Sequence, residues 1–141
     1  MSADTPTKNN GTLTTLRIDG SPIVQSYLRF NVQGLNGTVT RATLRIFANS
    51  AATSSCVANT VSDNTWTETG INYNNAPPLG MALGSSGPIS TGTWISMDVT
   101  VYITGDGTYN LALTTPGSTA VSLASRESGA NAPQLIIETS P

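Results

Sequence analysis

The sequence predicts an all-β fold, an antiparallel two-sheet β-sandwich with a jelly-roll-like arrangement of strands. Apolar and polar residues alternate along several short segments, a period of two that places one face of each strand in a core. Gly, Pro, Asn and Ser gather between these segments, where turns are expected. The 141-residue length suits one domain. We therefore expect residues 1–141 to form a single module, whose residues 1–12 are a turn-rich N-terminal segment.

Three segments in the first half of the chain carry the alternation. Leu13–Ile18 is a strand that ends at turn-forming residues 19–22. In Val24–Val32, one face holds Leu28, Phe30 and Val32, and the opposite face holds Tyr27, Arg29 and Asn31. In Val39–Ala48, one face holds Ala42, Leu44, Ile46 and Ala48, and the opposite face holds Thr43, Arg45 and Phe47. Each segment therefore presents an apolar face to a core and a polar face to solvent.

The second half contains shorter predicted strands. They are Cys56–Val61, Thr93–Met97, Tyr109–Leu113, Ala120–Ser125 and Gln134–Glu138. Residues 81–88 contain spaced glycines and are predicted to be a loop, as are residues 126–133. Asp98 is predicted to cap a single helical turn over residues 99–103, because a carboxylate can accept from nearby backbone N–H groups. The only cysteine, Cys56, is expected to be a small buried side chain.

The stretch Thr65–Pro77 is predicted to be a long loop that is either functional or tightly self-packed. It carries Trp66, Tyr73 and several amides, including Asn74. Sugar rings stack on exposed aromatic side chains, and their hydroxyls need polar partners. Trp66, Tyr73 and Asn74, together with Trp94 outside this stretch, are therefore candidate ligand-binding residues. In the alternative reading, Trp66 anchors the loop to the sandwich and Trp94 fills the core.

The composition excludes several kinds of function. The net charge of -2 provides no positive field for nucleic acid, so no nucleic-acid partner is expected. With no His and one Cys, the chain alone cannot build a His/Cys zinc site or a Ser-His-Asp triad. No apolar run is long enough to predict membrane insertion. The first residues do not resemble a signal peptide, so the chain is either intracellular or, as we expect, a piece of a larger exported protein.

Several segments together resemble a known family. They are residues 26–30 (SYLRF), Thr65–Pro77, residues 104–109 (TGDGTY), residues 125–127 (SRE) and residues 131–135 (NAPQL). In this order they resemble the DNRLRE domain, a group of bacterial and archaeal exported β-sandwich modules that includes carbohydrate-binding module family 96. The resemblance implies a non-catalytic carbohydrate-binding module of a secreted or cell-surface protein. Some members of the group bind acidic polysaccharides such as alginate.

The same resemblance implies that a first strand is missing. Members of the group carry a strand before the turn that residues 5–11 (TPTKNNG) match, whereas only four residues precede it here. A missing strand exposes the backbone groups of its neighbour. The alternative function is therefore a structural or interaction domain that accepts a β-strand peptide from a partner or a split-off first strand.

Arginines are candidate residues for an anionic sugar, because a guanidinium binds a carboxylate with two parallel hydrogen bonds. If their two strands are neighbours, Tyr27, Arg29 and Arg45 form one solvent-facing patch. In the alternative reading these arginines are solvated or pair with Glu68, Glu127 or Asp98. A structural calcium ion is the one cofactor considered, with Asp63, Asn64 and Asp98 as oxygen ligands. Glu68 and Glu127 are the only carboxylate pair considered for glycoside hydrolysis, and we expect no enzyme.

Overall fold

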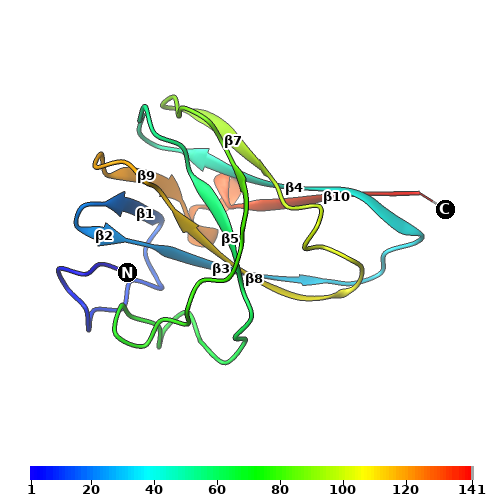
Figure 1. The fold of residues 1–141 in the computed structure, drawn as a ribbon, viewed down its shortest axis with the longest axis horizontal. Coiled ribbons are helices and arrows are strands. Elements are labelled where there is room, and N and C mark those ends of the chain that lie inside the picture. The colour runs from blue at the N-terminus through cyan, green and yellow to red at the C-terminus, as the bar shows by residue number, and fades with distance from the viewer. Residues whose placement is uncertain (141) are drawn as a thin grey trace.

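The computed structural model describes residues 1–140 and consists of ten strands and one short 3-10 helix (Figure 1). In chain order the elements are β1 (Thr15–Gly20), β2 (Ile23–Val24), β3 (Ser26–Val32), β4 (Thr38–Ala48), β5 (Val57–Val61), β6 (Ala82–Ser85), β7 (Thr93–Asp98), β8 (Gly107–Thr114), β9 (Val121–Ala124), η1 (Arg126–Asn131) and β10 (Gln134–Ser140). They form two antiparallel sheets, so the predicted β-sandwich is confirmed. No helix in the described part of the chain is long and apolar enough to cross a membrane.

The larger sheet has six strands and is built around β4, its longest strand. Its order is β10-β4-β9-β1-β2, and β7 pairs with the other side of β4. Arg45 of β4 lies opposite Ser96 of β7 and opposite Gln134 of β10. Strands β10, β4 and β7 therefore present one continuous outer surface, and β10 runs toward the end of the molecule opposite the N-terminus (Figure 1).

The smaller sheet has the order β3-β8-β5-β6. The prediction of a loop over residues 81–88 is wrong for Ala82–Ser85, which form β6 at the edge of this sheet. Strand β5 supplies the partners, with Val57 opposite Ser85, Ala58 opposite Gly84 and Asn59 opposite Ala82. Two hydrogen bonds continue the pairing before β6: Thr60 N donates to Met81 O at 2.9 Å, and Gly80 N donates to Thr60 O at 2.7 Å. This pairing overrides the low strand propensity of a glycine-containing segment.

The single turn that Asp98 was predicted to cap is present, but it is too short to be assigned as a helix. After β7 the chain makes a single turn in which Tyr102 N donates to Val99 O at 3.0 Å, and Asp98 Oδ1 accepts from Thr100 N at 2.9 Å. The helix instead follows β9, where the side chain of Ser125 accepts from Glu127 N and caps η1. The SRE segment contains this cap. The sequence predicted Ser125 to end a strand and residues 126–133 to form a loop, so η1 was not predicted.

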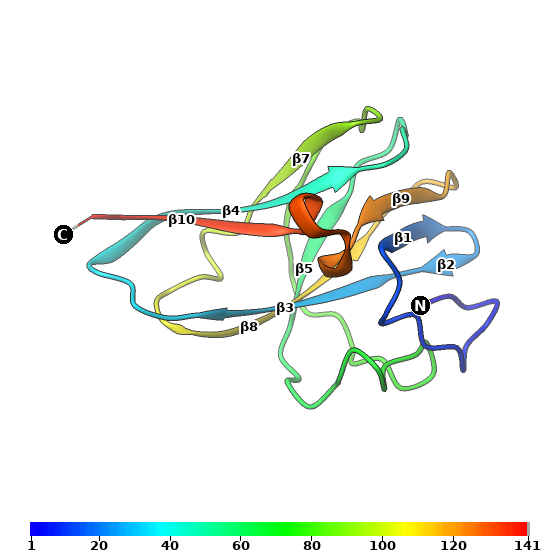
Figure 2. The ribbon, with the colours of Figure 1, turned by 180° about the vertical axis from the view of Figure 1, so that it is seen from behind.

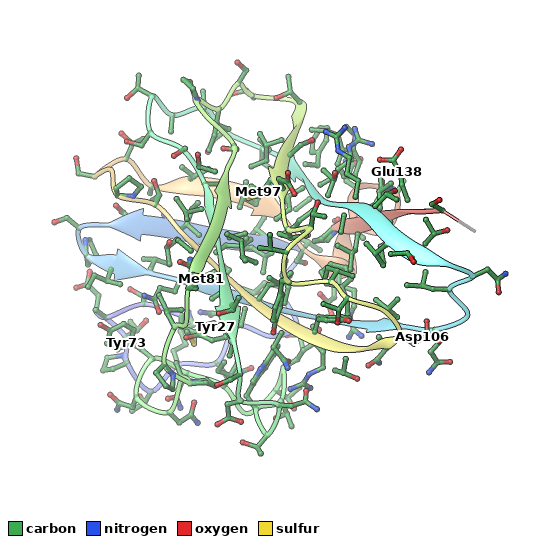
Figure 3. All side chains as sticks on the ribbon, turned by 45° about the vertical axis from the view of Figure 1, so that its right-hand side comes forward. Tyr27, Tyr73, Met81, Met97, Asp106 and Glu138 are labelled. Carbon is green, nitrogen blue, oxygen red and sulfur yellow. The ribbon has the colours of Figure 1, made fainter. Side chains whose placement is uncertain are left out.

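The hydrophobic core lies between the two sheets and confirms the predicted faces. The six-stranded sheet contributes fully buried Ile18, Leu44, Ile46 and Met97, and the four-stranded sheet contributes Leu111 and Leu113. Figure 3 shows Met97 in the middle of the sandwich. Cys56 is also fully buried, and this burial raises the pKa of its thiol to about 12. Cys56 is therefore a core side chain, as predicted.

The long segment between β5 and β6 packs against the N-terminal segment, and both lie on the same side of the molecule (Figures 1 and 2). The side-chain Nδ2 of Asn9 donates to Glu68 O at 2.7 Å and to Ile71 O at 2.6 Å. A Cβ atom at Gly11 would lie 1.9 Å from Glu68 O, so only glycine allows this close approach. The predicted loop is thus held in place by chain that is distant in sequence.

The first residues extend the six-stranded sheet beyond β2. Ser2 forms a bridge with Val24, Ala3 N donates to Ile23 O at 2.8 Å, and Gln25 N donates to Met1 O at 2.9 Å. The N-terminal amine donates to Gln25 O at 2.8 Å, and its burial lowers its pKa. The edge next to β2 is therefore covered by the chain's own residues.

Candidate functional site

The structure separates the arginines and the tyrosine that the sequence placed in one patch. Tyr27 and Arg29 lie on β3 of the four-stranded sheet, whereas Arg45 lies on β4 of the six-stranded sheet. The prediction of a shared Arg/Tyr patch is therefore wrong, because the turn between β3 and β4 carries the chain from one sheet to the other. Glu138 of β10 lies opposite Arg41 of β4 and so marks the outer face of the six-stranded sheet. In Figure 3, Tyr27 and Tyr73 lie well apart from it.

Arg29 holds the long loop. Its Nη2 donates to Trp66 O at 2.6 Å and to Asn64 O at 3.1 Å, and its Nε donates to Asn110 Oδ1 at 2.9 Å. Its guanidinium carbon lies 4.2 Å from the centroid of the Trp66 ring, which is a cation–π contact. Most of the donors that would bind a sugar carboxylate are already used, so the geometry gives Arg29 a structural role.

Tyr27 holds the other end of the same loop. Its hydroxyl donates to Pro77 O at 2.5 Å, and its ring meets that of Trp66 edge to face at 5.9 Å. Burial raises the pKa of Tyr27. Trp66 is 7% exposed, so the alternative reading of Trp66 as the anchor of the loop fits its position.

Tyr73 and Asn74 lie in the loop itself, with Tyr73 half-buried and Asn74 exposed. The backbone N–H of Asn74 donates to Pro6 O at 3.0 Å, and its side chain is exposed. Neither residue is brought close to Arg45 by strand pairing. Their role in ligand binding stays a prediction.

A group of aromatic and charged side chains covers the outer face of the six-stranded sheet. We call it the Arg45–Trp94 platform; its members are Arg41, Thr43, Arg45 and Phe47 of β4, Trp94, Ser96 and Asp98 of β7, and Gln134, Ile136 and Glu138 of β10. The members on β4 alternate with the buried side chains of that strand, so they point outward. The members on β7 and β10 lie directly opposite them and therefore share the same face. The alternative reading that Trp94 fills the core is wrong, since Trp94 lies half-exposed on this outer face.

The centre of the platform is an arginine stacked on a tryptophan. The Arg45 guanidinium carbon lies 5.0 Å from the centroid of the Trp94 ring, and Phe47 meets Trp94 edge to face at 5.6 Å. Within residues 1–140 the Arg45 guanidinium donates no hydrogen bond to the protein and forms no ion pair. Its nearest basic neighbour on the strand, Arg41, lies 4.0 Å from Glu138 in an exposed pair that contributes little. Arg45 is therefore a positioned cation with unused donors.

A groove of about 580 Å³ opens on a different part of the molecule, between the N-terminal segment, β1, β3 and the long loop. Apolar side chains line it, including Leu13, Leu16, Val24, Leu28, Trp66 and Ile71. Charged side chains also line it, and they are Asp4, Lys8, Arg17, Asp19, Glu68, Arg126 and Glu127. No pattern in the sequence predicts this groove, because its lining comes from segments that are far apart along the chain.

The whole chain matches one family of binding modules. The sequence model of carbohydrate-binding module family 96 matches residues 1–139. The chain belongs to this family. No curated protein sequence matches the chain. Membership makes the protein a carbohydrate-binding module, which is a non-catalytic class.

The carboxylate pair considered for glycoside hydrolysis is bridged by a cation in this family 96 module. Arg126 Nη2 lies 2.5 Å from Glu68 Oε2 and 3.2 Å from Glu127 Oε1. Hydrolysis needs the sugar or a water molecule between the two carboxyl groups. Here the guanidinium occupies that place, and the three side chains tie η1 to the long loop.

Two of the candidate calcium ligands, Asp63 and Asp98, form the same hydrogen bonds in two separate turns. Asp63 Oδ1 accepts from the hydroxyl and N–H of Thr65 at 2.6 and 2.7 Å, and Asp98 Oδ1 accepts from those of Thr100 at 2.6 and 2.9 Å. These bonds, the threonine hydroxyl first, lower the pKa of both carboxyl groups.

The side-chain oxygen of Asn64, the third candidate, accepts a hydrogen bond from Asn110 Nδ2 at 3.1 Å. Among residues 1–140, no three acidic, histidine or cysteine side chains gather as metal ligands. Calcium binding by Asp63, Asn64 and Asp98 stays a prediction, and a thermal melt with and without a chelator tests it.

Proposed function

We propose that the module binds acidic polysaccharide on the Arg45–Trp94 platform. The observation that carries this proposal is the Arg45 guanidinium, held 5.0 Å from the centroid of Trp94 with no protein acceptor in residues 1–140. A guanidinium in this state can bind a uronate carboxylate with two parallel charge-assisted hydrogen bonds. The ring of Trp94 offers an apolar surface beside it.

The shape of the platform suits an extended chain. Strands β10, β4 and β7 are hydrogen-bonded neighbours, so their outward side chains form one continuous sheet face. Arg41 and Arg45 lie on the same side of β4, about 13 Å apart at about 3.3 Å per residue. A chain lying along β4 would place different sugar units over the two guanidinium groups, whereas Gln134 and Ser96 flank Arg45 with hydrogen-bonding groups.

We further propose that the module works outside the cell or at its surface, as part of a larger exported protein. The sequence has only 10% charged residues, and its polar side chains are mostly uncharged. Carbohydrate-binding modules commonly occur in exported proteins, where their ligands are found.

Affinity electrophoresis in gels containing alginate, polygalacturonate or dextran tests the proposal. We expect retardation in the two uronate gels and none in dextran. Trp94→Ala should abolish the retardation, since it removes the surface that positions Arg45. Tyr73→Ala is the matched control, because it removes an aromatic side chain from a different part of the molecule. Equal migration of the parent protein in all three gels would refute the proposal. Equal loss of retardation in Trp94→Ala and Tyr73→Ala would show that the platform is not the specific binding site.

A second candidate function is the acceptance of a β-strand from a partner. The favouring observation is that β10 and β3 stand at the ends of their sheets, with no further strand beside them in the described chain. An extended peptide could add to such an edge through backbone hydrogen bonds. A peptide that binds the native state must raise the melting temperature, so a melt with a synthetic first-strand peptide of the DNRLRE type tests it. An unchanged melting temperature at millimolar peptide would exclude this function.

A further inference from the structure

We propose that β10 is a dimerisation edge, at which the module pairs with a second copy of itself. Strand β10 ends the six-stranded sheet: it pairs with β4 on one side and with no described strand on the other. Figure 2 shows β10 running from η1 to the end of the molecule that lies away from the N-terminus. An edge strand of this kind exposes a row of unpaired backbone N–H and C=O groups, to which another strand can add.

The inward side chains of β10 are only partly covered. Leu135 and Ile137 pack against the core but stay half-buried, although the residues opposite them on β4 are fully buried. The other edge of the same sheet differs, since Met97 of β7 is 1% exposed and Gly84 of β6 lies close against the backbone of Asp98. Apolar surface therefore remains to be buried at the β10 edge, and its burial favours association.

The features that usually protect an edge strand are missing from the centre of β10. The strand Gln134–Ser140 contains no lysine and no proline, and the irregularity in its pairing with β4 comes only after Glu138. Glu138 is its one charged side chain, and it faces outward at 4.0 Å from Arg41. Natural edge strands avoid pairing by means of lysines, prolines and bulges. Residues 134–138 thus form a regular strand without these features.

The same five residues are complementary to themselves, as a two-fold dimer requires. In the antiparallel register centred on Ile136, Leu135 lies opposite Ile137 of the second copy, on the inward face. On the outward face, Gln134 lies opposite Glu138 of the second copy, so an amide donor meets a carboxylate. A register centred on Glu138 would instead place two like charges opposite each other, which is destabilising. The chemistry of the strand therefore selects a second copy and one register.

This pairing places two Arg45–Trp94 platforms on one surface. The two-fold axis of an antiparallel strand pair is perpendicular to the sheet, so the platforms of both copies face the same side. With strands about 4.8 Å apart and about 3.3 Å per residue, the two Arg45 residues are about 20 Å apart. One acidic chain that contacts both would bind with a higher apparent affinity. This consequence rests on the acidic-polysaccharide proposal, whereas the pairing of β10 does not.

Sedimentation equilibrium of the parent protein without saccharide, at concentrations up to millimolar, tests the pairing. A short strand pair buries little surface, so we expect a reversible, concentration-dependent dimer. Ile136→Lys places two ammonium groups opposite each other and should weaken the dimer by about tenfold or more. Because Ile136 is 42% exposed, the melting temperature in dilute solution should stay unchanged. Val101→Lys is the matched control: it replaces another exposed apolar residue away from β10 and should dimerise like the parent.

A second pair of variants tests the register. Ile136→Glu alone should also be monomeric, whereas an equimolar mixture of Ile136→Lys and Ile136→Glu should form a heterodimer, because the register centred on Ile136 places the lysine opposite the glutamate. The proposal is overturned if the parent stays monomeric at millimolar concentration, if Ile136→Lys dimerises as strongly as Val101→Lys, or if the mixture does not associate. Alginate binding is measured separately on dilute protein, so either proposal can fail while the other holds.

Discussion

Replacement of Arg45 by alanine is the sharpest test of acidic-chain binding. The guanidinium stacks on Trp94 at 5.0 Å and spends no donor on the protein within residues 1–140, so its hydrogen bonds are available to a ligand. A hydrogen bond to a charged group contributes about 1.5–3 kcal/mol. Loss of the guanidinium should therefore weaken the Kd for an alginate oligosaccharide by about 10- to 100-fold. Stability should fall by only about 0.5–1 kcal/mol, the value of an exposed cation–π contact.

Isothermal titration calorimetry with an alginate hexasaccharide measures this change. Arg45→Lys keeps the positive charge but loses the planar fork, so it should fall between the parent and Arg45→Ala. Arg17→Ala is the matched control, because Arg17 is an exposed arginine away from the platform and its removal changes the net charge equally. Thermal melts of each variant report whether the fold is intact.

Two results would refute the reasoning. An unchanged Kd in a folded Arg45→Ala would show that the guanidinium does not bind the ligand. Equal weakening in Arg45→Ala and Arg17→Ala would show that binding follows net charge rather than a positioned site, and such binding should also disappear at high salt.

Three further predictions concern stability and reactivity. Arg29→Ala removes three hydrogen bonds that hold the Trp66 loop, so it should lower the free energy of unfolding by about 2 kcal/mol and the melting temperature by roughly 6 °C. A loss of stability no larger than that of Arg45→Ala would contradict the structural role of Arg29. The lowered pKa values of Asp63 and Asp98 stabilise the fold above their unfolded value near 3.8, and that contribution is lost as pH falls through the folded pKa values. Melts from pH 6 to pH 2.5 should therefore fall less steeply in an Asp63→Ala/Asp98→Ala variant than in the parent. Cys56, with a pKa of about 12, should resist iodoacetamide at pH 8 until the protein is unfolded, and rapid labelling of the native state would contradict its burial.

The residues that the sequence placed well are those whose environment depends on local pattern. Alternation along β4 identified Leu44 and Ile46 as core and Arg45 as outward-facing, because successive side chains of any strand point to opposite faces. The family-like segments also led to the correct family, which matches residues 1–139. The absence of histidine excluded whole classes of catalytic and zinc site before any fold was known.

The residues that the sequence misplaced are those whose environment depends on which strands are neighbours. Arg29 and Arg45 have the same local pattern, yet one binds the Trp66 loop and the other remains free on a different sheet. Strand β6 forms only because β5 offers it an edge. The groove likewise exists only where the N-terminal segment, the long loop and η1 converge.

By itself, then, the sequence determined the fold class and the inward and outward faces of the strands, since period and turn residues are local properties. Tertiary structure alone decided which arginine keeps its donors free, that Trp94 lies outside the core, and that a groove opens beside Trp66. These outcomes depend on pairing between segments 20 to 100 residues apart, such as Arg45 with Ser96 and Gln134, and no local pattern records which segments pair.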